Sequence, residues 1–199
     1  MLTRHCTQKL SNQKEMLELN DILLEGDART LSMMARRGQV TCLIGSTLAH
    51  RRQLLMAMLG LEPVVSGFVS IDGEPMTPRT ARELRHMMAY APERLVTEGE
   101  VRRYAPPTVQ QLFMLRANRS LPISNGILTQ EMRNTGCEGD TGQWLAVAVL
   151  LNKPILLCDN PPTAAAAYLR RLADGGRTVI VSTDERAILN VADNIVNCE

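Results

Sequence analysis

Residues 42–55 read CLIGSTLAHRRQLL, an apolar run, a glycine and eight mixed residues before a leucine pair. This order is the frame of a phosphate-binding loop, whose motif is G-x-x-x-x-G-K-[ST]. Gly45 stands at the first glycine of the motif. His50, Arg51 and Arg52 stand at the second glycine, the lysine and the hydroxyl residue. The scaffold of the motif is therefore kept, whereas the residue types that bind phosphate and magnesium are replaced.

Each replacement changes the chemistry of the loop. His50 carries a Cβ where a close phosphate needs glycine. Arg51 keeps a positive charge, but its planar guanidinium is bulkier than an ammonium group. Arg52 has no acceptor atom with which to hold magnesium. The simpler expectation is a solvated basic helix start, and the alternative is that the three side chains bind some other anion.

The composition is that of one globular domain. The chain has 199 residues, of which 45% are apolar, and this is enough to bury an ordinary core. Its 22 basic and 21 acidic residues nearly cancel. We therefore expect a single domain over residues 1–199 and no nucleic-acid partner.

The five cysteines have no metal-ligand spacing. Cys42 and Cys158 lie within apolar runs, so we expect reduced core thiols in a cytoplasmic protein rather than disulfides. Residues 1–14 are polar and do not form a signal peptide. No apolar run reaches the roughly 18–20 residues that cross a bilayer. A location at the membrane would thus be peripheral and depend on a partner.

Strands and helices alternate along most of the chain. We predict an edge strand at 16–19 and further strands at 31–34, 40–44, 67–73, 87–90, 154–159 and 178–182. Helices are predicted at 51–59, 80–84, 109–117, 142–151, 164–173 and 185–191. Prolines interrupt the pattern after residue 92, which indicates an inserted lobe at about 94–140. The alternation favours an α/β fold with a largely parallel core sheet.

The order of these segments resembles the nucleotide-binding subunits of ABC transporters over about residues 16–196. The marks that carry the resemblance are 42–45 with 54–55, 66–67 leading to 71–73, Gly142-Gln143 opening a helix through 146–148, and then 152–154, 155–159 and 178–181. The resemblance implies a P-loop NTPase-like core with a mainly parallel sheet, N-terminal antiparallel β-strands and a small inserted helical lobe.

The resemblance also assigns candidate nucleotide-binding positions. Glu93 matches the Q-loop glutamine, Asp159 the Walker B aspartate, Asn160 the catalytic glutamate that follows it and Thr183 the switch histidine. The signature motif LSGGQ aligns with residues 139–143. The candidate positions are Gly45, Arg51, Arg52, Glu93, Gly142, Gln143, Asp159, Asn160 and Thr183. No residue is assigned a catalytic or metal-binding role.

Several of these positions depart from the family pattern. Asn160 cannot act as a general base, and Thr183 lacks the histidine contact to the outer phosphate. The adenine-stacking aromatic would fall near Leu24, where residues 21–32 contain none. Asp140 opposes phosphate binding, and capping the helix that follows is its simpler role, as it is for Thr141. Glu93 is expected to be a surface carboxylate, with metal or nucleotide sensing as the alternative.

These departures predict a non-hydrolysing pseudo-ATPase that acts as a binding or regulatory subunit. ATP and magnesium are not expected to bind well, so no cofactor is assigned. The resemblance implies another ABC ATPase subunit, a membrane permease, or both as partners, with a homodimer as a further arrangement. Residues 93–117 would face the permease.

Two alternatives remain open at the level of sequence. The chain could be an ATP-binding subunit that still binds or hydrolyses ATP. It could also be a separate module that binds a different anion or small molecule through His50, Arg51, Arg52 and Asp159.

Overall fold

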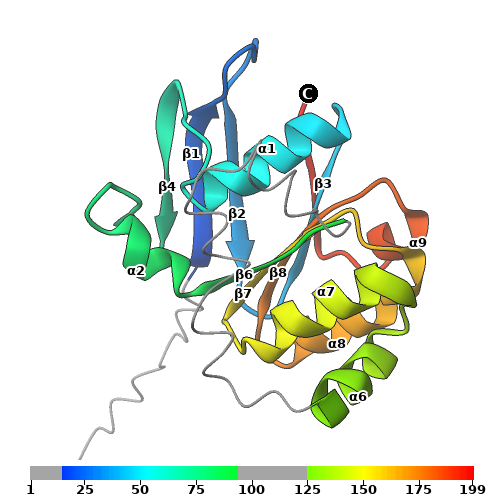
Figure 1. Ribbon diagram of the computed structural model, residues 1–199. Coiled ribbons are helices and arrows are strands. Elements are labelled where there is room, and N and C mark those ends of the chain that lie inside the picture. The colour runs from blue at the N-terminus through cyan, green and yellow to red at the C-terminus, as the bar shows by residue number, and fades with distance from the viewer. Residues whose placement is uncertain (1–14, 94–124) are drawn as a thin grey trace, which may run out of the picture.

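The computed structural model describes residues 15–93 and 125–199, and it contains two β-sheets (Figure 1). The antiparallel sheet has the order β2-β1-β4-β5, with bounds Leu31–Arg36, Glu15–Leu23, Ser66–Ile71 and Glu74–Pro75. The parallel sheet has the order β6-β7-β8-β3-β9, with bounds Met88–Ala91, Ile155–Asp159, Thr178–Ser182, Val40–Ile44 and Asn194–Asn197. The predicted α/β class with a parallel core sheet is confirmed.

The described helices are α1, α2, α6, α7, α8 and α9, with bounds Leu48–Met58, Ala81–Arg85, Asn125–Thr135, Gly139–Leu150, Ala166–Asp174 and Arg186–Leu189. A 3₁₀ turn, η1, spans Thr163–Ala165 and leads into α8. Helix α1 begins before the predicted start at residue 51, because Thr47 caps it by accepting a hydrogen bond from the N–H of His50.

The parallel sheet separates two hydrophobic cores, because successive side chains of a strand point to opposite faces. On one face, Leu43, Leu157 and Ile180 of the strands pack with α1 and the antiparallel sheet, which contribute Leu54 and Leu17. On the other face, Cys42, Leu156 and Val181 of the strands pack with α7 and α8, which contribute Leu145 and Leu169. Helix α1 thus lies between the two sheets, while α7 and α8 cover the far side (Figure 1).

The prediction that the strand at 16–19 lies at a sheet edge is wrong. Strand β1 pairs with β2 on one side and with β4 on the other, so it lies inside the antiparallel sheet. The alternation of Leu17 and Leu19 reports one buried face, and it carries no information on whether the strand edges are hydrogen-bonded. The short strands β5 and β9 were not predicted from their sequences.

The inserted lobe is only partly described. Its residues 94–124, including the predicted helix at 109–117 and most of the predicted permease-facing segment, lie outside the described residues. The rest comprises α6 and the start of α7. Because α7 begins at Gly139 with Glu138 at the N-cap position, Asp140 and Thr141 lie within its first turn. The N-cap position is thus occupied by Glu138 and not by either of these two residues.

No helix within residues 15–93 and 125–199 is both long enough and apolar enough to span a bilayer.

The buried cysteines give a test of the two cores. Cys42, Cys137, Cys158 and Cys198 are free thiols, and burial raises the pKa of Cys42 to about 12. Only about 10⁻⁴ of such a thiol is thiolate at pH 8, and this reactive fraction grows as the pH rises. We predict that a Cys6→Ser variant reacts very slowly with Ellman's reagent when native and releases four thiols per chain in guanidinium. Rapid reaction of the native protein would contradict this packing.

Candidate functional site

The loop between β3 and α1 turns sharply at two residues with positive φ angles. Gly45 has φ 69° and Ser46 has φ 52°. A Cβ on Gly45 would meet the side-chain oxygen of Asn197 at the end of β9, and the positive φ is itself strained for a residue with a Cβ, so both features favour glycine here. The predicted importance of Gly45 thus has a packing reason within the chain.

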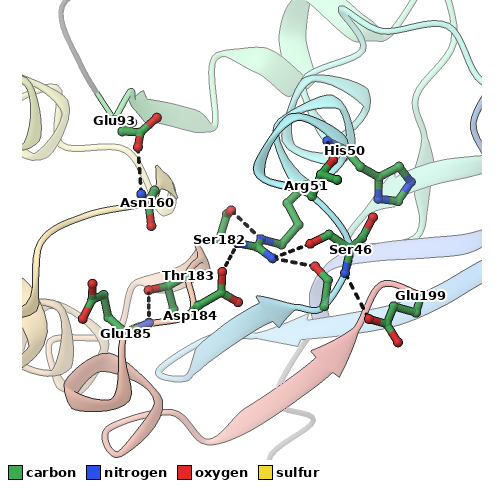
Figure 2. Close-up of polar contacts among 12 residues, drawn as sticks. Ser46, His50, Arg51, Glu93, Asn160, Ser182, Thr183, Asp184, Glu185 and Glu199 are labelled. Carbon is green, nitrogen blue, oxygen red and sulfur yellow. Dashed lines mark hydrogen bonds and ion pairs between the residues drawn. The ribbon is translucent and has the colours of Figure 1, made fainter.

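Arg51 points back into this loop and is 1% exposed. Its Nη1 donates to the carbonyl oxygens of Gly45 and Ser46 at 2.5 and 3.2 Å. Its Nε donates to Ser182 Oγ at 3.2 Å and its Nη2 to Asp184 Oδ2 at 2.6 Å, as Figure 2 shows. The interior of the loop is therefore filled by a guanidinium group of the chain itself.

This arrangement corrects the expectation of a solvated basic helix start. Arg51 is buried, and the side chain of His50 is 17% exposed and pairs with Asp27 at 2.8 Å. The alternative, that these side chains bind an anion, holds only in the sense that the anions are carboxylates of the same chain.

A backbone N–H of the loop also has a hydrogen-bond partner within the chain. The N–H of Ser46 lies 3.5 Å from Glu199 Oε1, a long hydrogen bond (Figure 2). The N–H of Cys198 donates to Ile44 O at 2.9 Å and continues the pairing of β9 with β3. A carboxylate thus lies at an amide group that a bound anion would otherwise approach.

Arg52 joins the ends of two neighbouring parallel strands. Its Nε donates to Asp159 Oδ2 at the end of β7, and its Nη2 donates to Glu93 Oε2 at 2.7 Å, just after β6. Glu93 Oε1 accepts from the side-chain amide of Asn160 at 2.8 Å. Tyr90 OH donates to Asp159 Oδ2 at 3.0 Å. Glu93 is therefore part of a network rather than a simple surface carboxylate.

Burial dominates the electrostatics of this network. It raises the pKa of Asp159, and the hydrogen bond and charge of Arg52 oppose that rise. Burial and the charge of Asp159 raise the pKa of Tyr90 well above its usual value. Burial alone would lower the pKa of Arg52, but its bond to Asp159 and the charge of Asp159 raise it overall. Arg52 is thus a permanent cation beside two carboxyl groups.

Asn160 and Thr183 support the backbone near these arginines. The N–H of Asn160 donates to Ser182 O at 2.8 Å, and Asn160 has φ 46°. Thr183 is buried, and its Oγ1 accepts from the N–H of Glu185 at 3.0 Å (Figure 2). Thr183 therefore holds the turn into α9, while the next residue, Asp184, pairs with Arg51.

Gly142 and Gln143 lie apart from this cluster in α7. A Cβ on Gly142 would clash with the carbonyl oxygen of Cys137, so helix packing accounts for the glycine. Gln143 is exposed. The hydrogen bonds given for the described residues do not connect either position with the loop. The structure thus brings together seven of the nine candidate positions, namely Gly45, Arg51, Arg52, Glu93, Asp159, Asn160 and Thr183.

A cavity of about 370 Å³ is lined by residues 27–31, His50, Cys198 and Glu199. None of these lining residues is Phe, Tyr or Trp, and Leu24, near the expected adenine platform, is buried in the core. The one ring among the lining residues is the imidazole of His50, which is bonded to Asp27.

The groups at the loop differ from those with which a phosphate-binding loop holds a magnesium nucleotide. The guanidinium of Arg51 lies among the loop carbonyls, where a triphosphate would have to enter. Arg52 contacts the carboxylate of Asp159, and a guanidinium has no acceptor for a metal ion. The part of the chain that the structure describes contains no group of three or more His, Cys, Asp or Glu that could hold a metal ion.

No family model matches the chain, but individual relatives do. It is 24% identical over 98% of its length to the "Putative ribose/galactose/methyl galactoside import ATP-binding protein 1" of Burkholderia cenocepacia. It is 28% identical over 81% of its length to the "Ribose import ATP-binding protein RbsA 1" of Rhizobium johnstonii. The chain spans less than half of each relative, covering 44% and 38% of their lengths.

Solved structures extend the comparison to the fold. An "ATP binding subunit of ABC transporter" superposes with a TM-score of 0.66 and 18% identity, covering 92% of this chain and 85% of that one. A "bacterial Atm1-family ABC exporter with ATP bound" gives a TM-score of 0.68 and 16% identity, over 94% of this chain and 37% of that one. The chain is thus similar in sequence to ABC transporter ATP-binding proteins, and it has the fold of the solved ABC ATPase domains.

Proposed function

We propose that the chain is a non-hydrolysing ABC-type domain that serves as a binding or regulatory subunit of an ABC-type complex. The observation that supports this most directly is the buried guanidinium of Arg51, which fills the loop and bonds to two loop carbonyls. A triphosphate would have to displace this side chain and turn the loop so that N–H groups, not carbonyls, face it.

The chemistry of phosphoryl transfer supports the same proposal. Transfer relies on positioning and on charges that stabilise the transition state, and each lost contact costs about 10²–10³ in rate. Asn160 cannot take a proton from water, and its amide is bonded to Glu93. Thr183 Oγ1 already accepts a backbone hydrogen bond. These losses are not additive, but each of them lowers the rate of phosphoryl transfer.

The proposed partners are another ABC ATPase subunit, a membrane permease, or both. The relatives are named as import ATP-binding proteins, and one structural neighbour is described as part of an ABC transporter complex. By analogy, the chain would act in the cytoplasm and reach the membrane through its partner.

Tagged chain purified from its native cells is expected to bring down an ABC ATPase subunit or a permease in a defined ratio. The same purification from cells that lack that partner gene is the control. A chain that elutes alone at its monomer mass under mild conditions would contradict the subunit proposal. It would not affect the proposed lack of hydrolysis.

The decisive test of the site is thermal unfolding with nucleotide. A ligand at 100 times its Kd stabilises a fold by about 2.7 kcal/mol. For a chain of this size that raises the Tm by about 5–11 °C. We predict a shift below about 1 °C with 1 mM ATP, with or without magnesium, measured by differential scanning fluorimetry.

A conventional ABC ATPase domain measured in parallel is the positive control. A shift of several degrees, together with steady phosphate release that Arg51→Ala abolishes, would favour the alternative of a subunit that still binds and hydrolyses ATP.

If Arg51 is an internal structural cation, its removal should weaken the fold. Arg51→Ala leaves the Gly45 carbonyl and Ser182 without their partner and opens a buried space. We predict a loss of about 3 kcal/mol in the free energy of unfolding, measured with urea. The corresponding fall in Tm is about 6–12 °C.

Arg82→Ala, at an exposed arginine of α2, is the matched control and should change stability by less than about 0.5 kcal/mol. An unchanged or raised Tm for Arg51→Ala would mean that Arg51 is held for a ligand at the expense of the fold.

A further inference from the structure

Arg52 bridges carboxyl groups at the ends of β6 and β7. We propose that its guanidinium is a built-in cation that takes the place of a divalent metal ion, and that Asp159 and Glu93 bind such an ion once the guanidinium is removed. This inference goes beyond the proposed function, because it concerns the cation at these carboxylates and not ATP turnover.

The first support is the way Arg52 divides its bonds. Separate nitrogen atoms reach the two carboxylates, Nε to Asp159 Oδ2 and Nη2 to Glu93 Oε2. These acids are distant in sequence, and the parallel pairing of β6 with β7 brings their strand ends together. Two carboxylates at such close quarters repel one another unless a cation lies between them. Arg52 supplies that cation.

The second support is the oxygen atoms that remain around the guanidinium. Asp159 Oδ1 is buried and has no hydrogen-bond partner within the described residues. Asn160 uses its amide nitrogen on Glu93, so its side-chain oxygen is not needed for that bond. Carboxylate and amide oxygens are the ligands that Mg²⁺, Mn²⁺ and Ca²⁺ prefer. These oxygen atoms are therefore typical ligands of a hard metal cation, although a guanidinium contacts the carboxylates here.

The third support is that Arg52 stays charged. A guanidinium keeps its proton at every physiological pH, so the charge is permanent. The side chain is also tethered to α1, so it cannot exchange with the solvent as an ion does. The ends of β6, β7 and the start of α1 are thus joined through one side chain of the protein itself.

The test is metal binding by Arg52→Ser, which removes the guanidinium and adds a hydroxyl oxygen. Mn²⁺ is titrated without nucleotide, and free Mn²⁺ is followed by electron paramagnetic resonance. We expect Arg52→Ser to bind one Mn²⁺ at least ~10-fold more tightly than the wild type, and Mg²⁺ to compete. Arg52→Lys keeps a cation at the site and should bind no more Mn²⁺ than the wild type.

The double variant Arg52→Ser/Asp159→Asn should lose the gained binding, which ties it to this carboxylate. A folded Arg52→Ser that binds Mn²⁺ no better than the wild type would overturn the proposal. So would wild-type binding that Asp159→Asn abolishes, since the metal and the guanidinium would then coexist.

Folding of Arg52→Ser provides a further readout. If the variant is unfolded in EDTA, Mn²⁺ should restore its circular dichroism spectrum, because the metal replaces the missing charge. Failure to fold with Mn²⁺ as well would also overturn the proposal. Because no arm contains ATP, a negative result here leaves the proposed lack of hydrolysis intact, and ATP turnover by the wild type would not affect this result.

Discussion

The buried guanidinium of Arg51 determines the shape and the chemistry of the loop after β3. A cation at 1% exposure is costly unless it is paired and hydrogen-bonded, and Arg51 meets this need with Asp184, Ser182 Oγ and two loop carbonyls. Those carbonyls point inward because the guanidinium is there. The loop with the positive φ angles of Gly45 and Ser46 is thus hydrogen-bonded to a side chain of the same protein.

His50, Arg51 and Arg52 act together as the anchor of α1. Successive residues of a helix point about 100° apart, so three basic side chains in a row leave the helix in three directions. His50 pairs with Asp27 in the β1–β2 loop, Arg51 with Asp184 after β8, and Arg52 with Glu93 and Asp159 after β6 and β7. One helix start therefore ties both sheets together through polar contacts, in addition to the apolar contacts of Leu54 and Leu55.

The sequence predicted the strands and helices of this structure better than its side-chain contacts. Continuous apolar runs such as 178–182 identify strands buried on both faces, and β8 has these bounds. The start of α1 was missed because Thr47 acts through a cap and not through apolar spacing. Seven candidate positions do converge, but the sequence did not show where the arginines point. Their acids lie up to 133 residues away, and nothing in the stretch 182–184 marked Asp184 as a partner.

The three pairings of α1 also bear on how such a loop can evolve. A single change of Arg51 to lysine leaves fewer donors for Ser182, Asp184 and the loop carbonyls, and a change of His50 to glycine removes the partner of Asp27 Oδ1. A hydroxyl residue at Arg52 exposes Asp159 and Glu93 to mutual repulsion. Each step toward a G-K-[ST] loop thus lowers stability before any phosphate contact is gained. A route to such a loop by single substitutions therefore passes through less stable chains.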